Sequence, residues 1–440
     1  MDPTTLFIVA LFLLVACSVL VGELMSRLGQ AALVGQLAVG VVFGPTLLGA
    51  PLGFLSLNTE LTGLQFLATF FILMTAGLAV TPEQVYATGV PAAALGITMF
   101  VAPFLAGAEV VHLLYPAFST TTDLFVALTI SITALPVLGI MLREFGLLGS
   151  KFGTTLLNSS LLNELAAVTT FSILLSVWGA HGSTTTAVAV AVLTVGVFLT
   201  SILAVHNGLR SLRHLRIWDR WVARFRGSWR SREAGFAILM VSGLGAALYS
   251  QALGLTFLVG AFYAGLLITP ESAGPHEHRQ IARVFDTITW GFFIPLFFAL
   301  VGFDMNLRSL VSSPLVLFSF AALCLFALLS KVAVGAMVTR LFGWSPSEAL
   351  GAGFLVASRG AVELAMAVIL EVRGIFSPEL FTVVAGVGVA TTLLSPIGAR
   401  PFVRHLGSAG RREPEGALRP WLDTALPPEG GEYDLAPPAE

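Results

Sequence analysis

The sequence predicts an all-α polytopic membrane protein with about thirteen transmembrane helices. Three observations carry this prediction. Of the 440 residues, 56% are hydrophobic and only 11% are charged, whereas soluble globular domains carry about 25% charged residues. The mean hydropathy is +0.89. Apolar stretches long enough to cross roughly 30 Å of hydrocarbon recur along most of the chain.

The apolar stretches follow one another from the N-terminus to about residue 400. They cover residues 4–24, 31–49, 61–80, 90–114, 122–142, 152–178, 184–205, 235–252, 254–270, 286–304, 312–341, 348–371 and 380–399. The start, MDPTTLFIVALFLLVA, has no basic residue, so we expect a membrane span there and not a cleaved signal. We expect one transmembrane domain over residues 1–406. The tail at 407–440, rich in Gly, Pro and Glu, is expected to be disordered and cytoplasmic.

Basic residues gather in the connections that follow odd-numbered stretches. These are Arg27, Arg143, Lys151, Arg279, Arg283, Arg340, the arginines between 210 and 232, and those after residue 399, whereas the even connections carry only Arg308 and Arg373. Cytoplasmic loops are enriched in Lys and Arg. We therefore expect the plasma membrane, with the N-terminus outside and the C-terminus cytoplasmic. The Trp-containing basic loop at 210–232 is expected to lie on anionic lipid and not on nucleic acid.

Two stretches are interrupted at mid-depth by helix-breaking residues. The fifth contains Thr133-Ala134-Leu135-Pro136, and the twelfth contains Ser358-Arg359-Gly360. An offset of seven stretches gives the two breaks opposite orientations in the membrane. Paired interrupted helices in an inverted repeat indicate the site of a secondary transporter. We expect stretches one to six and eight to thirteen to form the repeats, with the two broken helices crossing.

Glu164 is the first candidate for transport chemistry, because it lies about halfway along the sixth stretch. A charge at bilayer depth costs about 3 kcal/mol or more. Loss of hydration favours the protonated form of a carboxylate, so near neutral pH such a group can hold either a proton or a monovalent cation. The alternative is a permanently protonated Glu164 bonded to a neighbouring carbonyl.

Asn163 and Thr133 are candidate cation ligands beside Glu164. Asn163 offers an amide oxygen, and Thr133 and the carbonyls around the first break offer further oxygens. Polar residues also join transmembrane helices through hydrogen bonds. For Asn158, Ser159 and Ser160, ion binding and helix contact are weighed equally.

Lys331 is a second charge at membrane depth, inside the eleventh stretch. It either balances charge in an empty site or carries a proton itself. Its distance from both ends of the stretch argues against a side chain that reaches the interface. We expect structural roles at the broken helices for Pro136, Arg359, Gly360 and Glu363. Arg359 and Glu363, spaced i,i+4, are expected to neutralise each other across the second break.

The sequence argues against an enzyme and against a bound cofactor. It contains no GxxxxGK[ST] motif, so it shows no nucleotide-driven step. No nucleophile–base pair or His-rich metal set lies at membrane depth. Cys17 and Cys324 both lie in apolar stretches and are interpreted as small hydrophobic residues.

Several motifs, in order and spacing, resemble the cation:proton antiporter-2 family over roughly residues 5–402. They are LGQAALVGQLAVGVVFGPTLLG (28–49), SITALPVLGIMLREFGLLGSKFG (131–153), LLNSSLLNELAAV (156–168), PLFFALVGFDMNL (295–307), SKVAVGAMVTRLFG (330–343) and ASRGAVELAMAVI (357–369). The resemblance implies the sodium/proton antiporter fold, a homodimer, and a mobile core beside a rigid dimerisation domain. It also implies that Lys331 is the family's core lysine, opposite the ion-binding pair. The pair here is Asn163-Glu164, whereas the family usually has Asp at the second position.

Taken together, the residues and the resemblance predict an antiporter that exchanges Na+ or K+ for H+ by alternating access. Asn163 cannot ionise, so Glu164 is the single titrating acid of the pair and we expect electroneutral exchange. Two alternatives remain. One is a proton-coupled exporter of another small solute, and the other is a non-transporting membrane protein that senses cations. The retained core charges and the absence of a signalling domain weigh against the sensor.

Overall fold

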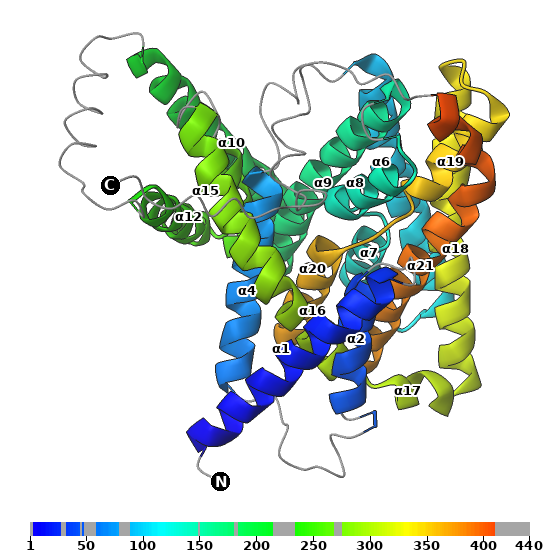
Figure 1. The fold of residues 1–440 in the computed structure, drawn as a ribbon, viewed down its shortest axis with the longest axis horizontal. Coiled ribbons are helices and arrows are strands. Elements are labelled where there is room, and N and C mark those ends of the chain that lie inside the picture. Colours follow the sequence, from blue (N-terminus) through cyan, green and yellow to red (C-terminus); the bar gives the residue numbers. More distant parts are fainter. Residues whose placement is uncertain are drawn as a thin grey trace, which may run out of the picture.

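The fold is drawn from a computed structural model that describes residues 3–27, 32–44, 46–47, 59–78, 89–147, 150–179, 184–213, 234–267 and 275–409. Every regular element within these ranges is helical, which confirms the all-α prediction for them (Figure 1). The last helix ends at Ala409, slightly beyond the predicted domain end at 406. The rest of the predicted tail, and most of the basic loop at 210–232, lie outside the described residues.

Each predicted apolar stretch contains a helix or a pair of half-helices. The first half of the chain holds α1 (Pro3–Arg27), α2 (Ala32–Phe43), α4 (Thr59–Leu78), α6 (Val90–Leu114), α7 (Thr120–Thr129), α8 (Leu135–Glu144), α9 (Lys151–Trp178) and α10 (Thr184–Arg213). The second half holds α12 (Ala234–Ala252), α13 (Phe257–Leu267), α15 (Pro275–Ile288), the π-helical turn η1 (Thr289–Phe293), α16 (Ile294–Asp304), α17 (Leu307–Ser312), α18 (Pro314–Leu341), α19 (Pro346–Leu355), α20 (Ala361–Val372) and α21 (Pro378–Ala409). Seven helices of the described residues are long and apolar enough to cross a membrane unbroken.

Both predicted breaks are present, between α7 and α8 and between α19 and α20. Pro136 lies in the first turn of α8, where its missing N–H costs no helical hydrogen bond. Gly360 immediately precedes α20 and lies against the first break. A Cβ at Gly360 would lie 2.7 Å from the Cβ of Ala134 and 3.1 Å from Cγ2 of Val137. The absence of a side chain at Gly360 therefore lets the two broken helices approach each other.

The helices pack as two inverted repeats. Helix α2 packs against α16, and α13, the counterpart of α2, packs against α4. At these contacts a Cβ on Gly40 would clash with the carbonyl oxygen of Ala299, and one on Gly265 would clash with that of Met74. Along the sequence, Gly265 follows Gly40 at the same distance at which Ala299 follows Met74. The two contacts are thus equivalent positions of the two repeats.

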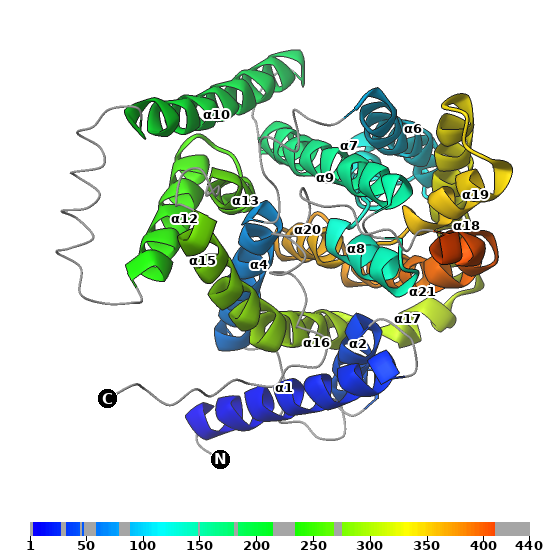
Figure 2. The same cartoon turned by 45° about the horizontal axis from the view of Figure 1, so that its top comes forward.

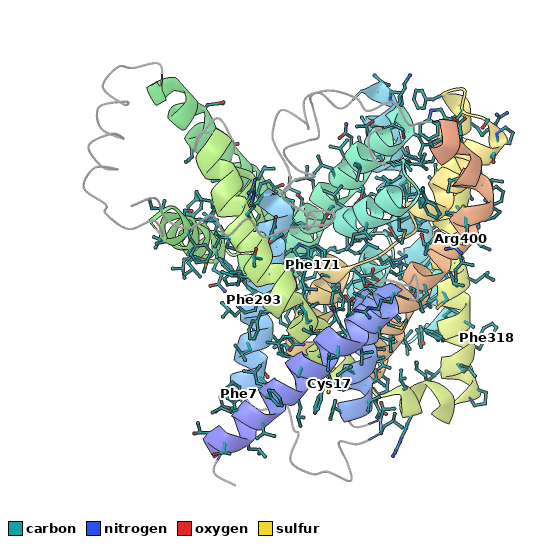
Figure 3. All side chains as sticks on the ribbon, viewed as in Figure 1. Phe7, Cys17, Phe171, Phe293, Phe318 and Arg400 are labelled. Carbon is teal, nitrogen blue, oxygen red and sulfur yellow. The ribbon has the colours of Figure 1, made fainter. Side chains whose placement is uncertain are left out.

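The helices form two groups that lie side by side (Figure 2). The first, called the core bundle below, contains α6 to α9 and α18 to α21 and holds both breaks. The second, called the panel, contains α1, α2, α4, α12, α13, α15, η1 and α16, and α10 runs alongside α9. Large apolar side chains also cover the outer surface, as at Phe318 of α18, which is 62% exposed (Figure 3). Such a surface fits a protein whose surroundings are lipid.

Candidate functional site

The two breaks meet inside the core bundle and bond to each other. The backbone N–H of Ala134 donates to the carbonyl oxygen of Ser358 at 3.2 Å. The hydroxyl of Thr133 donates to the carbonyl oxygen of Val356 at 2.8 Å. Backbone groups at a break have no helical partner, and leaving them unpaired in hydrocarbon costs several kcal/mol each. The crossing therefore satisfies part of the backbone that the interruption exposes.

Helix α9 braces the first break through Asn163. Its amide oxygen Oδ1 accepts the backbone N–H of Thr133 at 2.8 Å, and its Nδ2 donates to the carbonyl oxygen of Ser131 at 3.2 Å. One turn earlier, the hydroxyl of Ser160 donates to the carbonyl oxygen of Thr133 at 3.2 Å. Asn163 is 1% exposed. The amide of Asn163 thus supplies hydrogen bonds to backbone groups that have no helical partner at the break.

Lys331 reaches the same break from α18. Its Nζ donates to the carbonyl oxygen of Ser131 at 2.5 Å and to Oγ1 of Thr133 at 2.8 Å. The side chain is completely buried. Within the described residues, the ammonium has no carboxylate within ion-pair distance. It therefore interacts with the C-terminal end of α7, where the helix dipole places partial negative charge.

Glu164 of α9 contacts the other side of the break, where α8 begins. The backbone N–H of Leu135, the first residue of α8, hydrogen-bonds to its carboxylate. The second oxygen, Oε1, is buried and has no hydrogen-bond partner. A helix N-terminus carries partial positive charge and stabilises an anion. Glu164 thus combines a polarised anchor with one free oxygen that can take a proton or a cation.

Arg359 and Glu363 form the second charged group, and both are buried. Nη1 of Arg359 donates to the carbonyl oxygen of Thr129 at 2.7 Å, and Nη2 donates to that of Ile130. The distance from Nη1 to Oε1 of Glu363 is longer, 3.4 Å. The guanidinium therefore caps the end of α7 more closely than it pairs with Glu363. Oε2 of Glu363 has no partner.

The structure brings the candidate residues of α9, α18 and the two breaks into one polar region. Asn163, Thr133 and Lys331 are linked by hydrogen bonds, and Glu164 contacts the same break through Leu135. Sequence reasoning missed the backbone partners, above all the carbonyl oxygen of Ser131. It also missed Thr392, whose Oγ1 accepts the N–H of Arg359 at 3.1 Å. Hydroxyl-bearing residues on helices beside a break were the available signal.

Among the described residues, no group of three or more His, Cys, Asp and Glu side chains is arranged to hold a metal ion. The family model of the transmembrane sodium/hydrogen exchangers matches residues 10–405. The chain belongs to this family. The exchanger thus agrees with the family resemblance inferred from its motifs.

Curated relatives extend along nearly the whole exchanger. The Na(+)/H(+)-K(+) antiporter GerN of Bacillus cereus is 25% identical over 390 residues, which cover 89% of this chain and 94% of GerN. The Na(+)/H(+) antiporter of Enterococcus hirae is 24% identical and covers 91% of this chain and 99% of its own length. K(+)/H(+) antiporter 1 of Saccharomyces cerevisiae is 24% identical over 92% of this chain but only 46% of the yeast protein.

The fold has a solved counterpart. The structure of the sodium proton antiporter MjNhaP1 from Methanocaldococcus jannaschii superposes with a TM-score of 0.67 at 14% identity, covering 92% of this chain and 99% of that one. This likeness confirms the predicted sodium/proton antiporter fold. The function class follows from family membership: the members are transporters.

Proposed function

We propose that this exchanger moves Na+ or K+ in one direction and H+ in the other through a single shared group, the carboxylate of Glu164. The observation that carries the proposal is the geometry of this carboxylate. It is buried beside a broken helix and bonded at the N-terminus of α8, while its Oε1 has no hydrogen-bond partner. A proton and a cation compete for this oxygen, so the loaded carboxylate carries one or the other across the membrane.

Asn163 and Thr133 are proposed to complete the cation shell. Both are already bonded to the break, but the amide oxygen of Asn163 has a second lone pair, and the hydroxyl of Thr133 lies within the same network. Cation binding would draw on oxygens that also shape the break. This arrangement gives the site a direct way to couple ion binding to the geometry of the crossing helices.

Lys331 is proposed to act as a fixed positive charge. Its two acceptors, a carbonyl and a hydroxyl, are neutral. With Glu164 as the only titrating acid of the pair, a charged Lys331 makes each cycle an exchange of one proton for one monovalent cation. Pro136, Arg359, Gly360 and Glu363 are proposed to hold the broken helices in place. The working unit is proposed to be a homodimer in the plasma membrane, with the N-terminus outside and the C-terminus cytoplasmic.

The test uses vesicles that contain the purified protein and an imposed pH gradient. Addition of Na+ or K+, but not choline, is expected to dissipate the gradient. The Glu164→Gln variant keeps the shape of the side chain but cannot titrate, so its exchange is expected to be lost. Glu109→Gln, on the exposed surface of α6, is the matched control and is expected to keep full exchange. Cation-dependent dissipation by folded Glu164→Gln protein would refute the proposal.

A further inference from the structure

Among the described residues, the two largest apolar clusters differ in how many panel side chains they contain. The first, here the joint cluster, combines panel side chains such as Phe71 of α4 and Phe262 of α13 with Phe171 of α9. The second, here the bundle cluster, has its buried members only in the core bundle, such as Leu138 of α8 and Leu156 of α9. The joint cluster holds the half of α9 that ends at Trp178, and the bundle cluster holds the half that begins at Lys151.

Hydrogen bonds between the two groups of helices also lie toward the Trp178 end. The hydroxyls of Thr169 and Tyr263 are 3.3 Å apart. The hydroxyl of Ser176 donates to the carbonyl oxygen of Gly254 at 3.2 Å. Both contacts connect the later part of α9 with the panel helix α13 or the link before it. The panel and the core bundle are therefore joined by a thick seal on the Trp178 side.

On the Lys151 side the panel touches the core bundle far less. Among the described residues, Leu33 of α2 and Leu266 of α13 are the panel side chains that pack against the bundle cluster, and both are only partly buried. Leu33, Leu266 and Leu165 pack against both clusters. Leu165 directly follows Glu164, which is 1% exposed. Along α9 the bundle cluster ends at Leu161 and the joint cluster begins at Ala167, so Glu164 and the two panel leucines lie at the same boundary between the clusters.

The inverted repeat relates these two leucines to two residues on the opposite side. The separation in sequence that relates Gly40 to Gly265 also relates Leu33 to Leu258 and Val41 to Leu266. Leu258 is 0% exposed and Val41 is 8% exposed, and both belong to the joint cluster. Val41 and Leu258 are therefore part of the seal on the Trp178 side. Their equivalents Leu266 and Leu33 form only a thin cover on the Lys151 side.

We propose that Leu33 and Leu266 form a two-residue gate over Glu164 on the Lys151 side. When the core bundle moves against the panel, Val41 and Leu258 become the equivalent gate on the Trp178 side. The inference rests on the proposed exchange at Glu164 and names the residues that control access to it. Separating Leu33 and Leu266 from the core bundle breaks few apolar contacts, whereas opening the seal breaks many. From this state the site therefore opens toward the Lys151 side.

The test places single cysteines at the four positions, in a chain whose Cys17 and Cys324 are replaced by alanine. Lys151→Cys and Trp178→Cys, both at exposed ends of α9, mark the two faces. A membrane-impermeant maleimide is expected to label Leu33→Cys and Leu266→Cys only from the Lys151 face. It is expected to label Val41→Cys and Leu258→Cys only from the Trp178 face. Labelling of all four from one face would overturn the gate.

A second measurement asks whether the gate keeps exchange coupled. The Leu33→Ala/Leu266→Ala double variant is expected to leak protons without added cation, several times faster than the parent. The control is Leu20→Ala/Leu193→Ala, at positions that are 70% and 68% exposed, and it is expected not to leak. A tight double variant would contradict the gate. Because labelling of Leu33→Cys and Leu266→Cys requires no transport, it decides on the gate of the Lys151 side even if exchange at Glu164 fails its own test.

Discussion

Asn163 and Lys331 converge on one acceptor, the carbonyl oxygen of Ser131 at the end of α7. An amide and an ammonium from two different helices therefore hold the same unwound residue. A carbonyl oxygen has two lone pairs and can accept both bonds. Asn163 is neutral, and the hydrogen-bond acceptors of Lys331 are neutral as well. The charge moved per cycle therefore depends on whether Lys331 keeps its proton.

Exchange is expected to be independent of the membrane potential. If Lys331 remains charged and Glu164 alone titrates, no net charge crosses the membrane in a cycle. The membrane potential, which contributes roughly 2.3 kcal/mol per charge per 100 mV, then neither drives nor opposes exchange. Na+ exchange measured at several potentials set by K+ and valinomycin should reverse at the same ion gradients. A reversal point that moves with voltage would mean that Lys331 releases its proton during the cycle.

Glu164→Asp is expected to retain exchange with a changed apparent affinity for the cation. The shorter side chain withdraws the free oxygen from the crossing by one methylene but keeps its charge. The measurement is the Na+ and K+ concentration that gives half-maximal dissipation of a pH gradient. An unchanged value for both ions would show that the reach of the carboxylate does not set affinity, while the inactive Glu164→Gln serves as the baseline.

Gly360→Ala is expected to destabilise the crossing. The new Cβ would lie 2.7 Å from the Cβ of Ala134, and overpacking of this kind costs about 1–3 kcal/mol. The measurement is thermal unfolding of the purified protein in detergent, together with the exchange rate. Gly245→Ala is the control, because nothing lies within 4 Å of its new Cβ. Equal melting temperatures for the two variants would refute the steric argument.

The basic loop at 210–232 and the connection at 179–183 are expected on opposite sides of the membrane, with the basic loop in the cytoplasm. Single cysteines in each, labelled from one side at a time, measure this directly. Labelling of both from one side would remove the thirteen-span topology and, with it, the inverted insertion of the repeats.

The positions of the spans and of both breaks could be predicted because they depend on local chemistry. Long apolar stretches, Pro136 and Gly360 act on their own segments, and the structure places α7–α8 and α19–α20 accordingly. The partners of the polar side chains could not be predicted in the same way. Arg359 caps α7 from across the crossing, a contact fixed by how the two breaks meet and not by the i,i+4 spacing to Glu363.

The inverted repeat was expected from the two breaks alone, because no internal sequence identity was evident. The structure shows where the remaining similarity lies. Leu33-Val34-Gly35 and Leu258-Val259-Gly260 are identical triplets at equivalent positions. A Cβ on Gly35 would clash with Val21 and one on Gly260 with Ala246. The two repeats thus remain alike at small residues where helices touch. These residues are too few to make the sequence identity between the repeats evident.

The constant separation between equivalent residues has an evolutionary consequence. Between Val21 and Gly77, and between Ala246 and Gly302, neither copy has a net gain or loss of a residue relative to the other. One inserted residue turns the rest of a helix by about 100°, which would carry a contacting glycine away from its partner. Insertions within these helices would therefore be selected against in either copy, and length variation among related chains should collect in the connections.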